Sequence, residues 1–254
     1  MSLLAQIIFY TFLSGIVSLV GGVVLLGRIA WVRKTSLYFI SFAAGALLSI
    51  AFLDLLPEAL ELYQGADDRG IFFWALIGLL LFFLFERLVV HIHGHYVEDS
   101  QSNTHAHPTP ITMMMGDAFH NFLDGIAIAA TFIADPSLGV LTAIGVAAHE
   151  LPQEVSDFSV LIHHGWEKKK VLWINVIISL VSIVGAVTAY FFRELIEPHL
   201  PQLLALTAGG FIYIASSDLI PELSHKPKKD KRFAVTALLV AGVIIVYLFR
   251  HWFE

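Results

Sequence analysis

The 254-residue chain contains no cysteine, and charged residues make up only 14% of it. The absence of cysteine excludes disulfides and thiolate metal sites, so a metal ion could be held only by His, Asp, Glu, Asn or Gln. The scarcity of charge excludes an ordinary soluble domain, in which roughly 25% of residues are charged. The formal net charge of -6 is modest, and we expect no nucleic-acid partner.

Hydrophobic residues dominate instead, at 57% of the chain with a mean hydropathy of +0.76. Several apolar runs approach the roughly 20 residues that a spanning helix needs, which predicts an integral membrane protein in contact with the lipid bilayer. Residues 1–10 lack the basic segment of a secretory signal, and the apolar run from Leu3 to Leu26 is long. We therefore expect a first transmembrane helix there rather than a cleaved peptide.

The pattern predicts an all-α polytopic membrane protein, with residues 1–254 forming a single transmembrane domain. The connections between apolar segments are short, and the longest, residues 93–110, is a His-rich stretch with the composition of a solvated loop. The eight predicted transmembrane helices comprise residues 4–27, 36–60, 71–92, 111–133, 138–162, 171–192, 201–222 and 233–252.

Lys and Arg are distributed unequally between the two predicted sides of the membrane. Twelve of the fifteen lie in or beside connections on one side. Because basic residues concentrate in cytoplasmic loops, we expect the His-rich loop in the cytoplasm and both termini outside it. The short loops and the lack of cysteine favour a bacterial inner membrane.

A sequence repeat relates the second and seventh predicted helices at an offset of 164 residues. The segment Asp54–Glu58 reads DLLPE, and Asp218–Glu222 reads DLIPE. With eight helices, the second would run outward and the seventh inward, as in the inverted repeats of secondary transporters. We therefore predict that helices 1–3 and 6–8 form an inverted repeat around helices 4 and 5. Chance similarity between two apolar helices is the alternative.

Helices 4 and 5 carry the polar residues. Four of them on helix 4 follow i, i+3, i+4, i+7 spacing and form one stripe, namely Asp117, His120, Asn121 and Asp124. Those on helix 5 occupy two adjacent faces, and they are His149, Glu150, Gln153, Glu154 and Asp157. Ionisable side chains at this depth are costly and usually line an ion or substrate pathway. A structural polar network that only fixes helix packing is the alternative.

Imidazole and carboxylate groups together are the ligands that divalent transition metals prefer. Pro152 would also free a backbone carbonyl near residue 148 as a further oxygen. No ATP-binding pattern G-x-x-x-x-G-K-[ST] is present, so movement of an ion would depend on gradients. The sequence thus predicts transport of a divalent metal as substrate, zinc first and otherwise iron, manganese or cadmium, without a resident cofactor.

The motifs HNFLDG (residues 120–125) and HELPQE (residues 149–154) resemble those of the ZIP (Zrt/Irt-like) family of zinc and iron transporters, in its bacterial type. The resemblance covers essentially the whole chain. It implies a binuclear metal centre between helices 4 and 5 that moves divalent metal toward the cytoplasm.

The resemblance also implies individual ligands. His120 and Asp124 with Gln153 would line one site, and Asn121 and Glu150 would share Gln153 in the second. The matching positions further include His149 as a ligand and Glu222 in the inner exit region, and Asn175 on helix 6 is a candidate ligand or a helix–helix hydrogen bond. Many members have His or Glu where this chain has Gln153, so its bridging ligand is neutral.

We expect no enzymatic activity. The alternative is an intramembrane zinc metalloprotease, because His149 and Glu150 open an H-E-x-x-H pattern. That mechanism needs a second His where this chain has Gln153. A homodimer and a monomer both remain open from the sequence.

Overall fold

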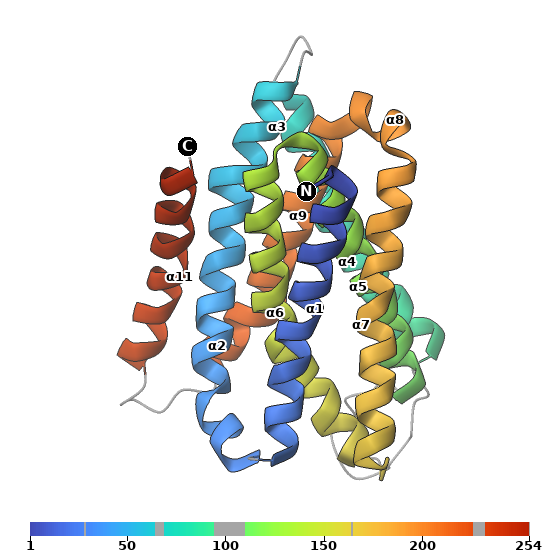
Figure 1. Cartoon of the computed structure of the whole chain (residues 1–254). Coiled ribbons are helices and arrows are strands. Elements are labelled where there is room, and N and C mark those ends of the chain that lie inside the picture. The colour runs from blue at the N-terminus through green and yellow to red at the C-terminus, as the bar shows by residue number, and fades with distance from the viewer. Residues whose placement is uncertain (28, 64–68, 94–109, 164, 226–231, 254) are drawn as a thin grey trace.

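The structure is a computed structural model that describes the chain except residues 28, 64–68, 94–109, 164, 226–231 and 254. Throughout the described residues the regular secondary structure is helical, which confirms the predicted all-α class (Figure 1). In chain order the elements are α1 (Leu3–Gly27), α2 (Ile29–Ser49), η1 (Ile50–Leu55), α3 (Leu56–Leu62), α4 (Arg69–His93), α5 (Pro110–Ala134), α6 (Pro136–His163), α7 (Lys168–Phe191), α8 (Arg193–Ile196), η2 (Glu197–His199), α9 (Leu200–Tyr213), η3 (Ile214–Leu219), α10 (Ile220–His225) and α11 (Arg232–Phe253).

Five helical stretches within the described residues are long and apolar enough to cross a membrane, as an integral membrane protein requires. They are Leu3–Val20, Leu37–Leu62, Lys168–Phe191, Arg193–Leu223 and Arg232–Phe249. A shorter apolar stretch lies on α4. The polar helices α5 and α6 are 25 and 28 residues long but are not among the five. The eight-helix count therefore stays a prediction, and most of the His-rich loop lies outside the described residues.

The polar helices α5 and α6 form a tight antiparallel hairpin. A single residue, Asp135, separates them, and its Oδ1 accepts hydrogen bonds from the backbone N–H groups of Ser137 (2.8 Å) and Leu138 (3.0 Å). An Asp cap followed by a proline at the first helical position is a strong start signal for a helix. This turn fixes the relative position of the two helices that carry the ionisable motifs.

The helices pack mainly within two groups, one formed by α1, α5, α6 and α7 and the other by α2, α4, α9 and α11. Pairs of helices approach so closely that glycine is required at the contact. A Cβ on Gly45 of α2 would lie 2.0 Å from the carbonyl oxygen of Leu239, and one on Gly242 of α11 would lie 2.4 Å from that of Phe42. Small residues of this kind allow backbones to touch inside a membrane.

Two π-helical segments interrupt otherwise continuous α-helices. The segment η1 precedes Pro57, and η3 precedes Pro221. Proline cannot donate the helical hydrogen bond and its ring clashes with the carbonyl four residues earlier, so a wider turn before it relieves the clash. The sequence pattern does not predict these interruptions.

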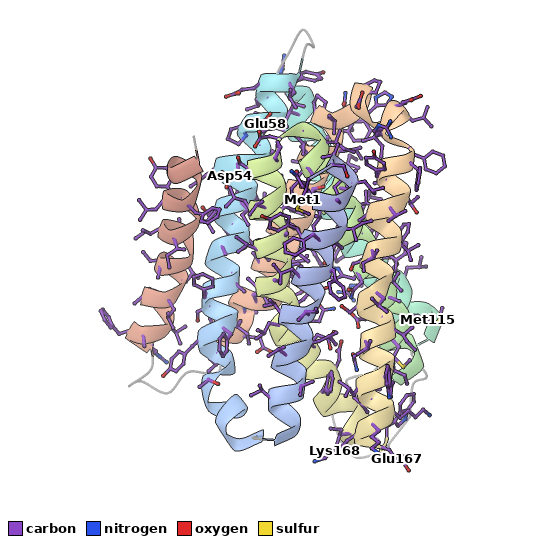
Figure 2. All side chains as sticks on the ribbon, in the orientation of Figure 1. Met1, Asp54, Glu58, Met115, Glu167 and Lys168 are labelled. Atoms are coloured by element: carbon purple, nitrogen blue, oxygen red, sulfur yellow. The ribbon has the colours of Figure 1, made fainter. Side chains whose placement is uncertain are left out.

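The two ends of the bundle differ in their charged groups. Figure 2 shows Asp54 and Glu58 toward one end, near α3, and Glu167 and Lys168 at the opposite end. Asp54 is buried and Glu58 is half-buried. The carboxylates of η1 and α3 therefore lie at the end of the bundle opposite the lysine at the start of α7.

Replacement of Gly242 by leucine tests the close contact between α2 and α11. We expect the Gly242→Leu protein to unfold at a lower temperature in detergent, because forcing a larger side chain into a filled contact costs about 1–3 kcal/mol. Thermal unfolding followed by circular dichroism measures this change. The matched control is Ala237→Leu, at an exposed position on the same helix. Equal melting temperatures for the two variants would contradict the contact.

Candidate metal centre

Three side chains from α5 and α6 converge between the two helices. His120 and Asp124 are one helical turn apart on α5, and His149 reaches them from α6. Asp124 and His149 are each only 1% exposed, whereas the His120 side chain is 14% exposed. Buried charges of this kind are retained where they are paired or bind a metal.

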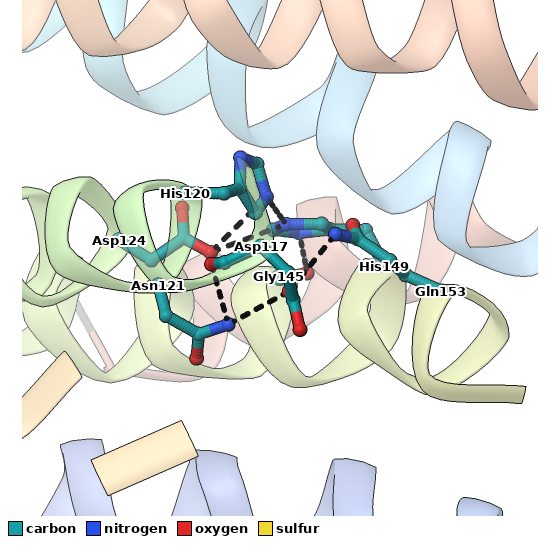
Figure 3. A network of polar contacts seen from close by, with 7 residues as sticks. All are labelled: Asp117, His120, Asn121, Asp124, Gly145, His149 and Gln153. Carbon is teal, nitrogen blue, oxygen red and sulfur yellow. Dashed lines mark hydrogen bonds and ion pairs between the residues drawn. The ribbon is translucent and has the colours of Figure 1, made fainter. Parts of the chain in front are cut away.

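The three ligand atoms form a nearly equilateral triangle (Figure 3). Asp124 Oδ2 lies 3.4 Å from His120 Nε2 and 3.3 Å from His149 Nε2, and the two Nε2 atoms are 3.1 Å apart. Donor atoms held at about 2.0–2.1 Å by one tetrahedral zinc ion are separated by about 3.3 Å. The triangle therefore has the dimensions of one face of a tetrahedral coordination shell.

The tautomer of His149 is fixed by its other ring nitrogen. Nδ1 lies 3.0 Å from the carbonyl oxygen of Gly145, one turn earlier on α6. A carbonyl oxygen can only accept, so Nδ1 carries the proton and the lone pair of neutral His149 is on Nε2, facing Asp124. Histidine ligands of metals are typically oriented in this way by a second hydrogen bond. Gly145 is a contributor that the sequence motifs did not single out.

Apolar rings flank the two imidazoles. The ring of Phe82 meets His120 edge-on with centroids 6.1 Å apart, and the ring of Phe211 lies 6.0 Å from His149. Both phenylalanines come from the other helix group, on α4 and α9. They limit access of water, which strengthens electrostatic interactions between an ion and its ligands.

A second polar group lies beside this triangle. Asp117 of α5 accepts hydrogen bonds from the amide nitrogens of Asn121 (3.1 Å) and Gln153 (3.2 Å). Three oxygens of this group, Asn121 Oδ1, Glu150 Oε1 and Glu154 Oε2, are among the buried side-chain oxygens that have no hydrogen-bond partner within the described residues, as is Asp124 Oδ2 of the triangle. An acceptor left in this state is costly unless something positive, such as a cation, satisfies it.

The remaining candidates lie outside the triangle. Asp157 is buried on α6 and hydrogen-bonds to Asp117. Glu222 is half-buried on α10. Asn175 is buried on α7, and its Nδ2 donates to the Val171 carbonyl of the same helix at 2.8 Å. Among the described residues, His120, Asp124 and His149 form the one group of three His or carboxylate ligands close enough to hold a single ion.

Comparison with known proteins settles the family. The profile of the ZIP Zinc transporter family matches residues 2–112 and 110–250. The chain belongs to the ZIP zinc transporter family. This confirms the resemblance inferred from the two motifs, while the bacterial subtype stays a prediction.

Curated relatives of this ZIP chain are named zinc transporters. The zinc transporter zipt-7.2 of Caenorhabditis elegans is 29% identical over 265 residues, which cover 82% of this chain and 57% of the relative. The zinc transporter ZIP13 of Pongo abelii is 28% identical over 87% of this chain and 67% of its own length. Human zinc transporter ZIP6 is 36% identical over 136 residues, 52% of this chain and 18% of the relative. The chain thus spans little more than half of the nematode relative. These relatives are eukaryotic, so the bacterial inner membrane stays a prediction as well.

Zinc binding to the ZIP chain should weaken as the pH falls. Protons compete with the metal for the two Nε2 atoms and for the Asp124 carboxylate, so the bound state loses affinity at low pH. We expect at least about tenfold weaker binding at pH 5 than at pH 7.5, measured by calorimetric titration of the purified protein. Thermal unfolding at both pH values controls for loss of the fold. Equal affinities would contradict binding through these ligands.

Proposed function

We propose that this ZIP protein moves divalent transition metal ions, zinc first, across the membrane into the cytoplasm along the interface of α5 and α6. The observation that carries this proposal is the triangle of His120, Asp124 and His149 between two long helices of an integral membrane protein. With three protein ligands, the coordination shell keeps an open position through which an ion can enter and leave. Relatives named as zinc transporters support zinc as the substrate.

The proposed centre holds two ions. The triangle binds the first, and Asn121, Glu150 and Gln153 bind the second. This assignment differs from the one that the motifs implied, in which Gln153 bridges both sites, because it gives Gln153 to the second site only and His149 to the first. The buried oxygens of Asn121 and Glu150 that have no hydrogen-bond partner among the described residues support this second position. Its ligands include two neutral amides, so we expect it to bind zinc more weakly than the triangle does.

The proposed architecture is an inverted repeat. It relates the first three predicted transmembrane helices (residues 4–27, 36–60 and 71–92) to the last three (residues 171–192, 201–222 and 233–252), and the predicted helices 4 and 5 between them correspond to α5 and α6. Adding 164 to the residue numbers of η1 (Ile50–Leu55) gives those of η3 (Ile214–Leu219). Adding 164 to the last residue of α2, Ser49, gives the last residue of α9, Tyr213. Shifted α1 would cover residues 167–191, and α7 is Lys168–Phe191. The helical boundaries thus follow the offset first seen in the DLLPE and DLIPE segments.

The glycine contacts support the same architecture. The offset relates Gly45 to Gly209 and Gly78 to Gly242. Gly45 and Gly242 mark the close contact of α2 with α11, and Gly209 and Gly78 mark that of α9 with α4. Adding 164 to the residue numbers therefore relates the α2–α11 contact to the α9–α4 contact. This is expected when two copies of a unit are related by a pseudo-two-fold axis.

The proposed path begins near Asp54 and Glu58 at the outer end, where negative charge attracts cations electrostatically. The ligands of α5 and α6 then replace the water shell of the ion, and Asp157 and Glu222 receive it on the cytoplasmic side. Alternating access by movement of one helix group against the other fits the division of the bundle into two groups.

Eight transmembrane helices with both termini outside the cytoplasm complete the proposal. The exposed side chains of Lys168, Lys169 and Lys170 lie at the end of the bundle opposite Asp54 and Glu58, which supports a cytoplasmic location for that end. Lys170 Nζ stacks 4.1 Å above the ring of Trp166, an arrangement suited to the membrane interface. A homodimer stays a prediction.

The metalloprotease alternative is not supported. The fifth position of the H-E-x-x-H pattern, where the second His would stand, holds Gln153, whose amide nitrogen hydrogen-bonds to Asp117. The relatives described above are named as transporters rather than as proteases.

Loss of a triangle ligand should abolish transport. We expect Asp124→Ala and His149→Ala proteins in proteoliposomes to take up zinc on the order of 100-fold more slowly than the wild type, because removing a ligand costs at least as much as disturbing its supporting hydrogen bonds. Uptake is measured with a zinc-sensitive dye inside the vesicles. Met115→Ala, at an exposed position on α5, is the matched control. Wild-type uptake by either ligand variant would contradict the assigned path.

Selectivity should follow the chemistry of the ligands. Mixed imidazole and oxygen donors favour zinc, iron, manganese and cadmium over calcium and magnesium. We expect cadmium, manganese or ferrous ions in about tenfold excess to reduce zinc uptake, while calcium and magnesium at the same excess leave it unchanged. Strong competition by magnesium would instead indicate a site made only of oxygen ligands.

A further inference from the structure

Asp117 links α5 to α6 immediately beside the triangle. Its Oδ1 accepts hydrogen bonds from Gln153 Nε2 of α6 at 3.2 Å and from Asn121 Nδ2 of α5 at 3.1 Å (Figure 3). Asn121 Nδ2 also donates to the backbone carbonyl oxygen of Asp117 at 3.2 Å. One carboxylate oxygen therefore holds two amide groups that come from different helices.

These hydrogen bonds determine which way each amide points. A backbone carbonyl can only accept, so the Asn121 atom that faces Asp117 is the nitrogen, and its oxygen lies on the opposite side of the amide. That oxygen is buried and has no hydrogen-bond partner among the described residues. Because Asp117 Oδ1 already accepts from Asn121, it acts as an acceptor toward Gln153 as well, which turns the Gln153 oxygen away from Asp117.

We propose that Asp117 is a positioning residue of the second metal position, which orients the Asn121 and Gln153 amides so that both oxygens are presented to the ion. The inference rests on the two-ion centre proposed above, and it names Asp117 as the residue that holds the two neutral ligands, Asn121 and Gln153, in place. Outer hydrogen bonds of this kind fix the orientation of ligand groups and raise metal affinity.

The same geometry accounts for an amide at position 153. Glutamine supplies an N–H that Asp117 can accept, whereas an ionised glutamate there has no N–H to donate and would add a further carboxylate beside those of Asp117 and Asp157. Asp117 and Gln153 are thus matched across the α5–α6 interface. The negative charge of Asp117 thus favours a neutral amide at position 153.

Asp117 differs from Asp124 in its surroundings. The Asp124 Oδ2 atom faces the Nε2 atoms of two imidazoles, which is the environment of a ligand. Asp117 is instead surrounded by Asn121, Gln153 and the carboxyl of Asp157, all within hydrogen-bonding contact. Its Oδ1 is occupied by two amide hydrogen bonds and neither of them comes from a group of the triangle, so we assign it to support rather than to direct coordination.

Two substitutions separate these roles in the purified full-length chain. Asp117→Asn keeps an oxygen that can accept both amide hydrogen bonds but removes the negative charge, whereas Asp117→Ala removes the acceptor. The number of zinc ions bound per chain and the two stepwise affinities are measured by equilibrium dialysis against zinc. Met115→Ala is the control, and thermal unfolding reports whether each variant is folded.

We expect the wild type to bind two zinc ions, and all variants to bind the first with unchanged affinity. Asp117→Ala should bind the second ion about 10–100-fold more weakly, whereas Asp117→Asn should stay close to the wild type. Equal weakening by Asn and Ala would show that the charge coordinates directly and would overturn the assignment, as would full retention of the second ion by Asp117→Ala. A wild type that binds one ion would overturn both this inference and the two-ion proposal, and one that binds none would overturn the transport proposal itself.

Discussion

The molecule depends on the compensation of the Asp124 carboxylate inside an apolar helical bundle. An isolated charge there would be prohibitively costly; Asp124 Oδ2 and the Nε2 atoms of two imidazoles lie within 3.4 Å of one another, and in the function proposed above a cation bound between them offsets that cost. The hairpin of α5 and α6 brings the three groups together. Helices α1, α2, α7 and α9 pack against these two helices and hold them in place.

The backbone contributes to this arrangement through glycine. Next to Asp124, a Cβ on Gly125 would lie 1.8 Å from the carbonyl oxygen of Ser182, so α7 rests directly on α5 beside the ligand. On α6, Gly145 accepts the hydrogen bond that orients His149, and its missing side chain leaves room for Ile50 of η1. Gly145 therefore serves both close packing and the orientation of His149.

Much of the fold could be predicted from the sequence, because long apolar runs and a cluster of ionisable residues within them permit few alternatives. HNFLDG and HELPQE led to the family and to His120, Asp124 and His149 as candidate ligands, although they grouped His120 and Asp124 with Gln153, whereas the structure brings His149 to them and bonds the Gln153 amide to Asp117. The hydrogen bonds of Asp117 could not be predicted, since i+3 and i+4 spacing indicates a shared face but not which atom bonds to which. Asn175 was predicted to coordinate a metal or to bond to another helix; its Nδ2 donates within α7 to the Val171 carbonyl, and a role of its oxygen stays a prediction. The number of transmembrane helices also stays a prediction, because the polar residues of α5 and α6 leave these two helices out of the stretches that are apolar enough to be assigned as membrane spans.

The π-helical segments affect how residue positions on these helices are assigned. A π turn accommodates one extra residue, so the chain beyond it is rotated by about 100° relative to an uninterrupted α-helix. A helical wheel drawn through residues 37–62 would therefore assign Glu58 to the wrong face when it is registered on the residues before Ile50. Cysteine-scanning or cross-linking data from this part of the protein should be plotted with separate registers before and after η1, and likewise around η3.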